Sequence, residues 1–204
     1  QREDAMLIFD LETDGLLDDV TTVHCMVTQD TETGDVCTYD PTQIELGIEV
    51  LENFEHIGGH NVMAYDLPVL RKLYGFQHKG KVYDTLVASR LIWPNMKEKD
   101  MLKRTVDNKL IGSHSLKAWG QRLHFNKGAY GEQDAAWDAY TPEMLDYCVQ
   151  DVALNVKLFE LIQSKQYPEE PMELEHEMNR LLIKQQVEGF PFDVPKAQKL
   201  YTLL

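Results

Sequence analysis

The sequence lacks several features that would assign it to a specialised class of protein. No apolar run approaches the roughly 18 residues that a membrane-spanning helix needs. The cysteines stand apart at positions 25, 37 and 148, without a C-x-x-C pair, which argues against a disulfide or zinc framework. This usage is typical of a reducing, cytosolic compartment. Residues 1–5 contain no apolar stretch of a signal peptide, so secretion is not expected.

Positive charge is also scarce, because 20 Lys and Arg residues face 34 Asp and Glu residues, for a formal net charge of -14. A protein that coats nucleic acid needs a basic surface, so that class is excluded. The net negative charge is compatible with a protein that binds cations. The rest is ordinary for one globular domain with a large core: 204 residues, 43% hydrophobic and 26% charged.

Short apolar runs bounded by turn signals predict the strands. The first is a buried strand over residues 5–9 that ends at Asp10. A hairpin joins two strands at 23–28 and 36–39, because Thr33-Gly34-Asp35 between them is a turn signal. Two weaker strands are expected near 57–61 and 81–83.

Apolar residues at helical spacing predict the helices. Helices are expected near 43–55, 67–74, 85–92 and 116–123, the last capped by Ser113 or Ser115, and from Thr141-Pro142 to about Lys165. The charge-rich residues 97–109 and residues 126–140 are expected to be loops. This order predicts an α/β or α+β domain of roughly 165 residues, followed after a break at 167–171 by two helical segments that form a separate piece.

Two acids follow the first predicted strand. Asp10 and Glu12 are two residues apart, so an extended backbone turns both to one face of the sheet. Two such carboxylates repel each other unless a cation lies between them, and a hard divalent ion prefers oxygen ligands. The pair alone is equally compatible with two solvated acids that end the strand.

Two further acids strengthen the metal hypothesis. Asp66 ends the loop that begins at Asn61, although it could instead cap the helix that follows. Tyr147 and Asp151 are four residues apart in a predicted helix, so they share a face. Their apolar neighbours turn that face inward, where an aromatic residue is ordinary packing but an aspartate is unexpected.

The ordered set Asp10-Leu11-Glu12, Asn61 to Asp66 and Tyr147 to Asp151 resembles the three motifs of the DEDD 3′→5′ exonucleases. The tyrosine four residues before the last acid is typical of the DEDDy branch. The segments Asp84-Thr85-Leu86 and residues 112–120 are similar to the proofreading domains of bacteriophage family A DNA polymerases. Residues 173–177 and 189–193 are similar to the segment that opens the polymerase region of that family.

The resemblance implies an RNase H-like α/β fold, with a mixed five-stranded sheet flanked by helices. It also implies two Mg²⁺ or Mn²⁺ ions, roughly 3.5–4 Å apart as in two-metal enzymes. The four acids Asp10, Glu12, Asp66 and Asp151 would hold them, and Tyr147 would orient the attacking water. The expected reaction is removal of nucleotides from single-stranded or frayed DNA 3′ ends, which is proofreading during replication.

The same resemblance assigns substrate contacts to three more residues. The Thr13 backbone and the Glu12 side chain would meet the terminal 3′-OH. Leu16 would act as an apolar wedge under the last base, and Asn61 would lie near the terminal sugar-phosphate. Leu16 could equally be core, and its neighbour Leu17 could be the wedge instead. A further base-stacking residue is sought among Leu123, His124 and Phe125.

The resemblance further implies where the protein acts and what it binds. It predicts an exonuclease domain over residues 1–166, and over 167–204 a linker and the truncated start of a polymerase region that contributes little to catalysis. The expected partners are a single-stranded DNA 3′ end, the remainder of the polymerase chain and a processivity factor, in the cytoplasm of a bacterial host and without a membrane. A DEDDy ribonuclease that trims RNA 3′ ends and a catalytically decayed scaffold domain are the alternatives.

Overall fold

The computed structural model describes residues 5–125 and 137–203 of the chain. Its strands are β1 (Leu7–Thr13), β2 (Val23–Asp30), β3 (Val36–Tyr39), β4 (His56–Gly59) and β5 (Lys81–Asp84). Its helices are α1 (Ile44–Asn53), α2 (Asp66–Tyr74), α3 (Thr85–Ile92), α4 (Met96–Lys103), η1 (Asn108–Leu110), α5 (Leu116–Arg122), α6 (Pro142–Gln163), α7 (Glu169–Glu188) and α8 (Val194–Tyr201).

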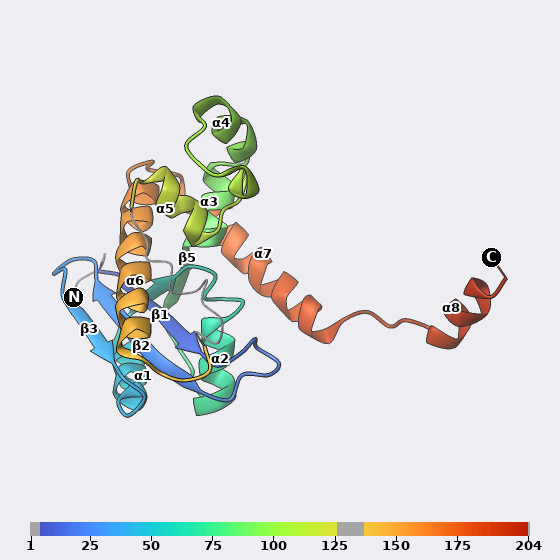
Figure 1. Ribbon diagram of the computed structural model, residues 1–204, viewed down its shortest axis with the longest axis horizontal. Helices are drawn as coiled ribbons and strands as arrows, with labels where there is room; N and C mark the ends of the chain where they lie inside the picture. The colour runs from blue at the N-terminus through green and yellow to red at the C-terminus, as the bar shows by residue number, and fades with distance from the viewer. Residues whose placement is uncertain (1–4, 126–136, 204) are drawn as a thin grey trace.

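The strands form one mixed sheet in the order β3-β2-β1-β4-β5 (Figure 1). β2 pairs antiparallel with both β1 and β3, whereas β4 pairs parallel with both β1 and β5. The predicted five-stranded mixed sheet and α/β class are therefore confirmed. β1 lies in the middle of the sheet, and it runs past Asp10 to Thr13 instead of ending at Asp10 as the sequence predicted.

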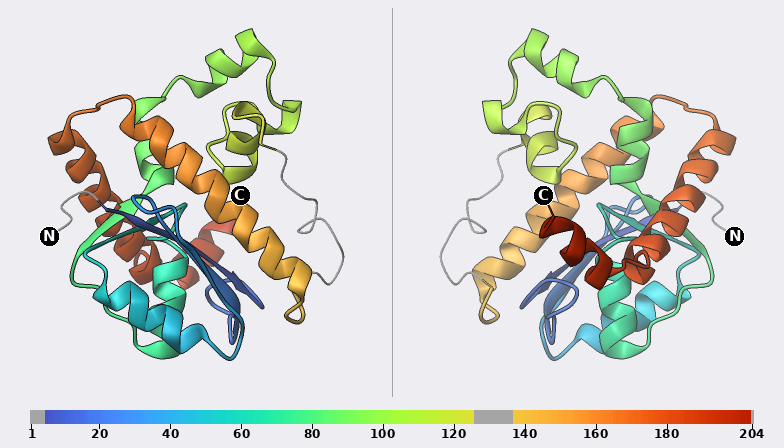
Figure 2. Two further views of the ribbon diagram at one scale, coloured as in Figure 1. Left: turned by 90° about the vertical axis from the view of Figure 1, so that its left-hand side faces the viewer. Right: turned by 90° about the vertical axis from the view of Figure 1, so that its right-hand side faces the viewer.

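Helices cover both faces of the sheet, with α6 on one side and α1 and α2 on the other (Figures 1 and 2). Alternation along β1 divides its side chains between these two layers. Leu7, Phe9 and Leu11 enter the core under α1 and α2, while Ile8 enters the core under α6. Asp10 and Glu12 have the parity of Ile8, so they face α6.

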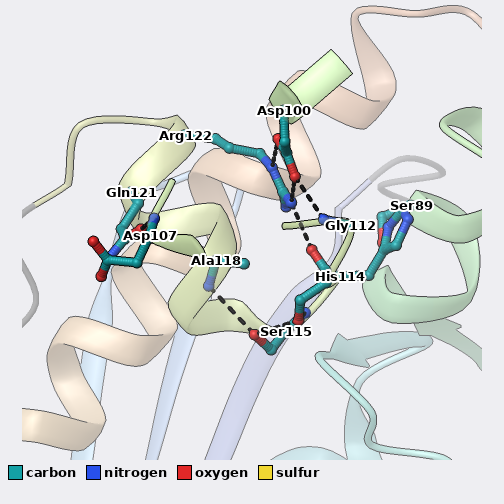
Figure 3. A network of polar contacts seen from close by, with 10 residues as sticks. Ser89, Asp100, Asp107, Gly112, His114, Ser115, Ala118, Gln121 and Arg122 are labelled. Atoms are coloured by element: carbon teal, nitrogen blue, oxygen red, sulfur yellow. Dashed lines mark hydrogen bonds and ion pairs between the residues drawn. The ribbon is translucent and has the colours of Figure 1, made fainter. Parts of the chain in front are cut away.

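The helices α3, α4 and α5 form a unit beyond one end of the sheet (Figure 1). A buried ion pair holds it together, because the Arg122 guanidinium donates to both carboxylate oxygens of Asp100, at 3.0 and 2.7 Å (Figure 3). Arg122 also donates to the Ser113 carbonyl, and the Gly112 amide donates to Asp100.

This unit corrects one prediction. Residues 97–109 were expected to be a loop, but the structure contains α4 (Met96–Lys103) and η1 there. The charge-rich segment lacks a clear apolar period, and α4 buries only Met96 and Asp100. The expected helix near 116–123 is confirmed, and the Ser115 side chain caps it by accepting from the Ala118 amide. Of the expected loop at 126–140, residues 126–136 lie outside the described part of the chain.

The two helices at the carboxyl end differ in their packing. α7 begins at Glu169, with Pro171 in its first turn, and buries Met172 and His176 against α3 and β5. It is therefore packed onto the domain. α8 buries no residue and lies away from the sheet at the end of an extended segment (Figure 1). No helix among the described residues is long and apolar enough to span a membrane.

Candidate metal centre

The two acids of β1 lie beneath α6, together with a cysteine of that helix. One ligand atom each from Asp10, Glu12 and Cys148 lie within 4.8 Å of one another. Glu12 and Cys148 are buried and Asp10 is half-buried, so the alternative of two solvated acids at a strand end is wrong. The pairing of β1 with β2 shifts register between Glu12 and Thr13, which bends the strand just after the second acid.

Cys148 acts on this pair as a hydrogen-bond donor. Its Sγ lies 3.5 Å from the Asp10 carbonyl oxygen and 3.9 Å from Asp10 Oδ2. Burial, a hydrogen bond with Cys25 and the charges of Asp10 and Glu12 raise the pKa of the Cys148 thiol well above its usual value. The thiol therefore stays neutral and donates to Asp10. The carboxylate oxygens remain as the hard ligands that Mg²⁺ or Mn²⁺ prefers.

α6 supplies the tyrosine and the last acid. The helix begins as predicted, with the Thr141 hydroxyl accepting from the Met144 amide and with Pro142 in the first turn. Tyr147 is half-buried and meets the Trp137 ring edge to face, with 6.1 Å between the ring centroids. Asp151 is buried one turn further along the helix. Tyr147 directly precedes Cys148 in the helix, and Asp151 follows Cys148 by three residues.

Asp66 approaches the same strand from another direction. It is the first residue of α2 and is buried, with Tyr65 as the helix N-cap and no side-chain cap bond. The alternative of a capping aspartate is therefore wrong. Its carboxylate accepts from the Leu11 amide, between the two acids of β1. The β1–β4 ladder ends at Ile8 and Gly58, so Asp66 bonds to β1 beyond the end of β4.

Burial and the nearby charge of Asp84 raise the pKa of Asp66 to about 7. Asp66 and Asp151 lie outside the close trio of Asp10, Glu12 and Cys148. Two acids are therefore close together on β1, and the other two enter from α2 and α6. The paired carboxylates of Asp10 and Glu12 need cationic compensation, and their oxygen donors suit a hard divalent ion.

Asn61 begins the loop that leads to Asp66. Its φ of 67° lies in the left-handed region, which asparagine tolerates better than most residues. Its carbonyl accepts from the amides of Ala64 and Tyr65, so the loop is a tight turn. Gly59 precedes it, and a Cβ there would lie 2.1 Å from Val62 Cγ1 and 2.7 Å from the Phe9 carbonyl. Only glycine fits where the loop folds back on β1.

The structure distinguishes Leu16 from Leu17. Leu16 is 77% exposed, while Leu17 packs against the main core. Leu16 is therefore not core, and its exposure leaves it available to a ligand. The Thr13 hydroxyl bonds to the Gly15 carbonyl and to the Tyr65 hydroxyl, so the start of this loop is tied to the loop that precedes Asp66.

The loop that carries Leu16 is also held at its far end. Asp14 accepts from the amides of Thr21 and Thr22, at 2.9 and 3.0 Å, and from the Thr21 hydroxyl. Partial burial opposes ionisation of Asp14, but these hydrogen bonds outweigh it and lower its pKa to about 2. Lys72 donates to the carbonyls of Leu17 and Asp18, each at 2.9 Å.

The three candidates for a further base-stacking residue differ in their surroundings. Leu123 packs against the core under α5 and α6, and Lys157 covers the ring of Phe125 at 4.8 Å. His124 is exposed, with a φ of 51°. None of them is singled out as a stacking platform.

Sequence reasoning assigned no role to four buried polar residues that join the elements of the site, although three of them stand in segments that carry the resemblance. The Thr85 hydroxyl donates to Asn155 of α6, at 2.7 Å, and lies 2.9 Å from His60 Nδ1. The other two, Asp84 and His176, meet where β5 ends against α7. An acid that ends a strand and directly precedes a helix is the signal that could have identified Asp84.

The chain is similar in sequence to two curated phage proteins. The chain is 35% identical to the DNA-directed DNA polymerase of Escherichia phage T7, over 98% of this chain and 35% of the phage protein. It is 36% identical to the corresponding polymerase of Enterobacteria phage T3 over the same shares. The chain thus spans about a third of the length of these curated relatives. No protein-family profile matches it.

Solved structures resemble the fold. Brucella melitensis NrnC with bound Mg²⁺ has a TM-score of 0.57 at 17% identity, over 93% of this chain and 89% of that one. Escherichia coli Exonuclease I in complex with a dT13 oligonucleotide has a TM-score of 0.57 at 12% identity, over 80% and 42%. The catalytic core of RRP6 from Trypanosoma brucei has a TM-score of 0.58 at 16% identity, over 87% and 46%. At these identities the likeness shows the fold, which is that of the RNase H-like DEDD exonucleases.

Proposed function

We propose that this chain, a relative of the bacteriophage DNA polymerases with the fold of the DEDD exonucleases, is a metal-dependent 3′→5′ exonuclease that proofreads DNA during replication. One observation carries the proposal: Asp10 and Glu12 lie side by side on the central strand, directly under the helix that bears Tyr147 and Asp151. A fold alone does not imply an activity, but converging acids on this fold do suggest one.

The four acids suit divalent cations. Asp10, Glu12, Asp66 and Asp151 would hold Mg²⁺ or Mn²⁺, and we propose two ions per site. Bound ions would activate a water for attack on the terminal phosphodiester and stabilise the charge on the leaving 3′ oxygen. Cys148 keeps Asp10 oriented by donating to it.

For Tyr147 we propose a role in orienting water and not in deprotonating it. A phenol with an ordinary pKa near 10 is a poor base at neutral pH, so the hydroxyl would act as a hydrogen-bonding group. The edge-to-face contact with Trp137 limits the freedom of its ring. We therefore propose that Tyr147 fixes the position of the attacking water.

The substrate contacts remain proposals that the geometry supports. The Thr13 backbone and the Glu12 side chain would meet the 3′-OH. The exposed Leu16 would slide under the terminal base, and Asn61 would lie beside the terminal sugar-phosphate. The proposed partners are a single-stranded DNA 3′ end and the remainder of the polymerase chain, in the cytoplasm of a bacterial host cell. A processivity factor stays a prediction of the resemblance alone.

The direct test is release of mononucleotides from a 3′-labelled oligonucleotide. We expect hydrolysis with Mg²⁺ or Mn²⁺ that a chelator abolishes, and faster digestion of single-stranded DNA than of a matched RNA. Preferred digestion of RNA would support the ribonuclease alternative. A chain that hydrolyses neither substrate would support the decayed scaffold.

Alanine variants of three acids test the residue assignments. Asp10→Ala, Asp66→Ala and Asp151→Ala should each reduce hydrolysis by several orders of magnitude. Thermal unfolding without metal should be unchanged or shifted upward, because each change relieves repulsion among the acids. Asp146→Ala is the matched control, since Asp146 is an exposed acid of the same helix. Inactivity that is explained by unfolding would remove the metal-site assignment.

A further inference from the structure

α7 sends one buried polar side chain into the domain. His176 is 5% exposed and packs against the Tyr83 ring, with 5.0 Å between the ring centroids. Its Nδ1 lies 2.7 Å from the Met172 carbonyl, and its Nε2 lies 2.9 Å from the Asp84 amide nitrogen. A backbone amide can only donate, so Nε2 is the acceptor and Nδ1 carries the proton. The two bonds therefore select one tautomer and one ring orientation.

Asp84, whose backbone amide donates this bond, organises the loop next to it. Its Oδ1 accepts from the amides of Asn61 and Leu86, each at 2.9 Å, and its Oδ2 accepts from the Met63 amide at 3.1 Å. Asp84 is 1% exposed, so these bonds are shielded from water. One carboxylate thus joins the end of β5 and the start of α3 to the loop that begins at Asn61.

That loop leads directly to Asp66. The amides of Ala64 and Tyr65 bond to the Asn61 carbonyl, and the Leu67 amide bonds to the Val62 carbonyl at 2.9 Å. These backbone hydrogen bonds run continuously from Asn61 to the start of α2. A displacement of Asn61 and Met63 would be passed to Asp66, which contacts β1 between the two acids.

We propose that α7 is part of the exonuclease site, with His176 as a positioning residue that orients Asp66 through Asp84. The inference rests on the proposed function, which makes Asp66 a metal ligand. It extends the catalytic unit beyond residue 166 to include at least the first half of α7. It also replaces the expectation that residues from about 172 onward contribute little to catalysis.

Docking of α7 alone would not need a histidine at this position. Met172 already supplies apolar packing, and Lys81 pairs with Glu169 and Glu173 at the surface, at 3.1 and 3.3 Å. A leucine could fill the buried space without the cost of desolvating an imidazole. The two-sided hydrogen bonding of His176 therefore points to a requirement for the Asp84 contact itself.

The test compares three variants of the 204-residue chain. His176→Leu removes the acceptor but keeps apolar bulk, and His176→Gln keeps an acceptor at a similar reach. Met172→Ala loosens the packing of α7 but leaves the Asp84 bond in place. If His176→Leu does not fold, Asp84→Asn tests the next step of the same link. The asparagine side chain has an NH₂ group where the carboxylate had an acceptor oxygen, so it cannot accept all the bonds from the Asn61, Met63 and Leu86 amides.

Two measurements report on the position of Asp66 without depending on the rate of hydrolysis. Mn²⁺ binding without substrate should weaken about tenfold in His176→Leu, the scale of losing an outer partner of a metal ligand. His176→Gln should restore most of the affinity, and Met172→Ala should keep it while its melting temperature falls. Amide hydrogen exchange at Asn61 and Met63, measured without metal, should accelerate in His176→Leu only.

The outcomes separate this inference from the function on which it rests. A folded His176→Leu with wild-type Mn²⁺ affinity and wild-type exchange at Asn61 and Met63 would overturn it, while the exonuclease assignment would stand. Equal loss of affinity in Met172→Ala would overturn it too, because any loosening of α7 would then suffice. A wild-type chain without metal-dependent hydrolysis would overturn the proposed function together with this inference.

Discussion

Asp66 lies in surroundings that oppose its ionisation. Burial and the charge of Asp84 raise its pKa to about 7, against about 3.9 for an unfolded aspartate. The folded protein therefore binds the additional proton between about pH 4 and pH 7. Its stability falls as the pH rises through that window, because deprotonation is easier in the unfolded chain.

Asp66→Asn should consequently stabilise the metal-free protein, and the gain should grow from pH 4 to pH 7 and level off above. A difference of one in pKa between the folded and unfolded states is worth about 1.4 kcal/mol, so a gain of at least about 1 kcal/mol is expected at pH 8. Urea unfolding with a chelator at several pH values measures it. Asp14→Asn is the control of opposite sign, because its lowered pKa stabilises the folded state at neutral pH. A gain that does not vary with pH would contradict this account of Asp66.

Tyr147→Phe removes one hydroxyl and leaves the ring in contact with Trp137. If the hydroxyl positions the attacking water, the rate under single-turnover conditions should fall by roughly ten- to a thousand-fold. The loss should be smaller than in Asp10→Ala, and metal binding should barely change because the acids are intact. Tyr140→Phe, outside α6, is the matched control. Wild-type turnover in Tyr147→Phe would remove the tyrosine from the mechanism and weaken the DEDDy assignment.

At the scale of elements, the Asp100–Arg122 pair determines whether α4 and α5 stay together. The two side chains are 3% and 8% exposed, so removing one leaves the other charge buried without its partner. Asp100→Ala and Arg122→Ala should each lower the free energy of unfolding by about 3–5 kcal/mol. Denaturant unfolding measures this, and the double variant should lose less than the sum of the two.

The pair between Lys81 and Glu169 provides the contrast. Both side chains are largely exposed, so Lys81→Ala should barely change the free energy of unfolding. A loss in Asp100→Ala that is as small as this would mean that water reaches the α4–α5 contact.

At the scale of the whole molecule, the two carboxyl-terminal helices should separate by function. α8 buries no residue, whereas α7 holds Asp84 through His176. Deletion of residues 189–204 should therefore leave hydrolysis of short single strands unchanged. Deletion of residues 167–204 should raise the metal concentration needed for half-maximal rate. Equal activity of the two truncated chains across a metal titration would contradict the role given to α7.

Net charge should limit the affinity of the chain for DNA. With a formal charge of -14, it has little basic surface to neutralise phosphates. Without metal and at physiological salt, a single-stranded oligonucleotide should bind no more tightly than about 1 µM. Fluorescence anisotropy measures this. Submicromolar binding would mean that a local basic surface, and not the metal centre, holds the substrate.

Much of the site follows from local patterns that the sequence carries by itself. The two-residue spacing of Asp10 and Glu12 sets both on one face of β1, and the four-residue spacing of Tyr147 and Asp151 sets them on one face of α6. Thr141-Pro142 starts that helix where expected. These features depend on backbone periodicity and on residues a few positions apart, so they can be read along one segment.

What only the tertiary structure decided depends on contacts between distant segments. α4 has too weak an apolar period to be recognised, and its buried Asp100 is held by Arg122, 22 positions away. The link from His176 to Asp84 spans 92 positions. The sequence contains both residues, but only folding places α7 on β5. The burial that raises the pKa of Asp66 likewise exists only in the packed molecule, because desolvation arises from every element around a group.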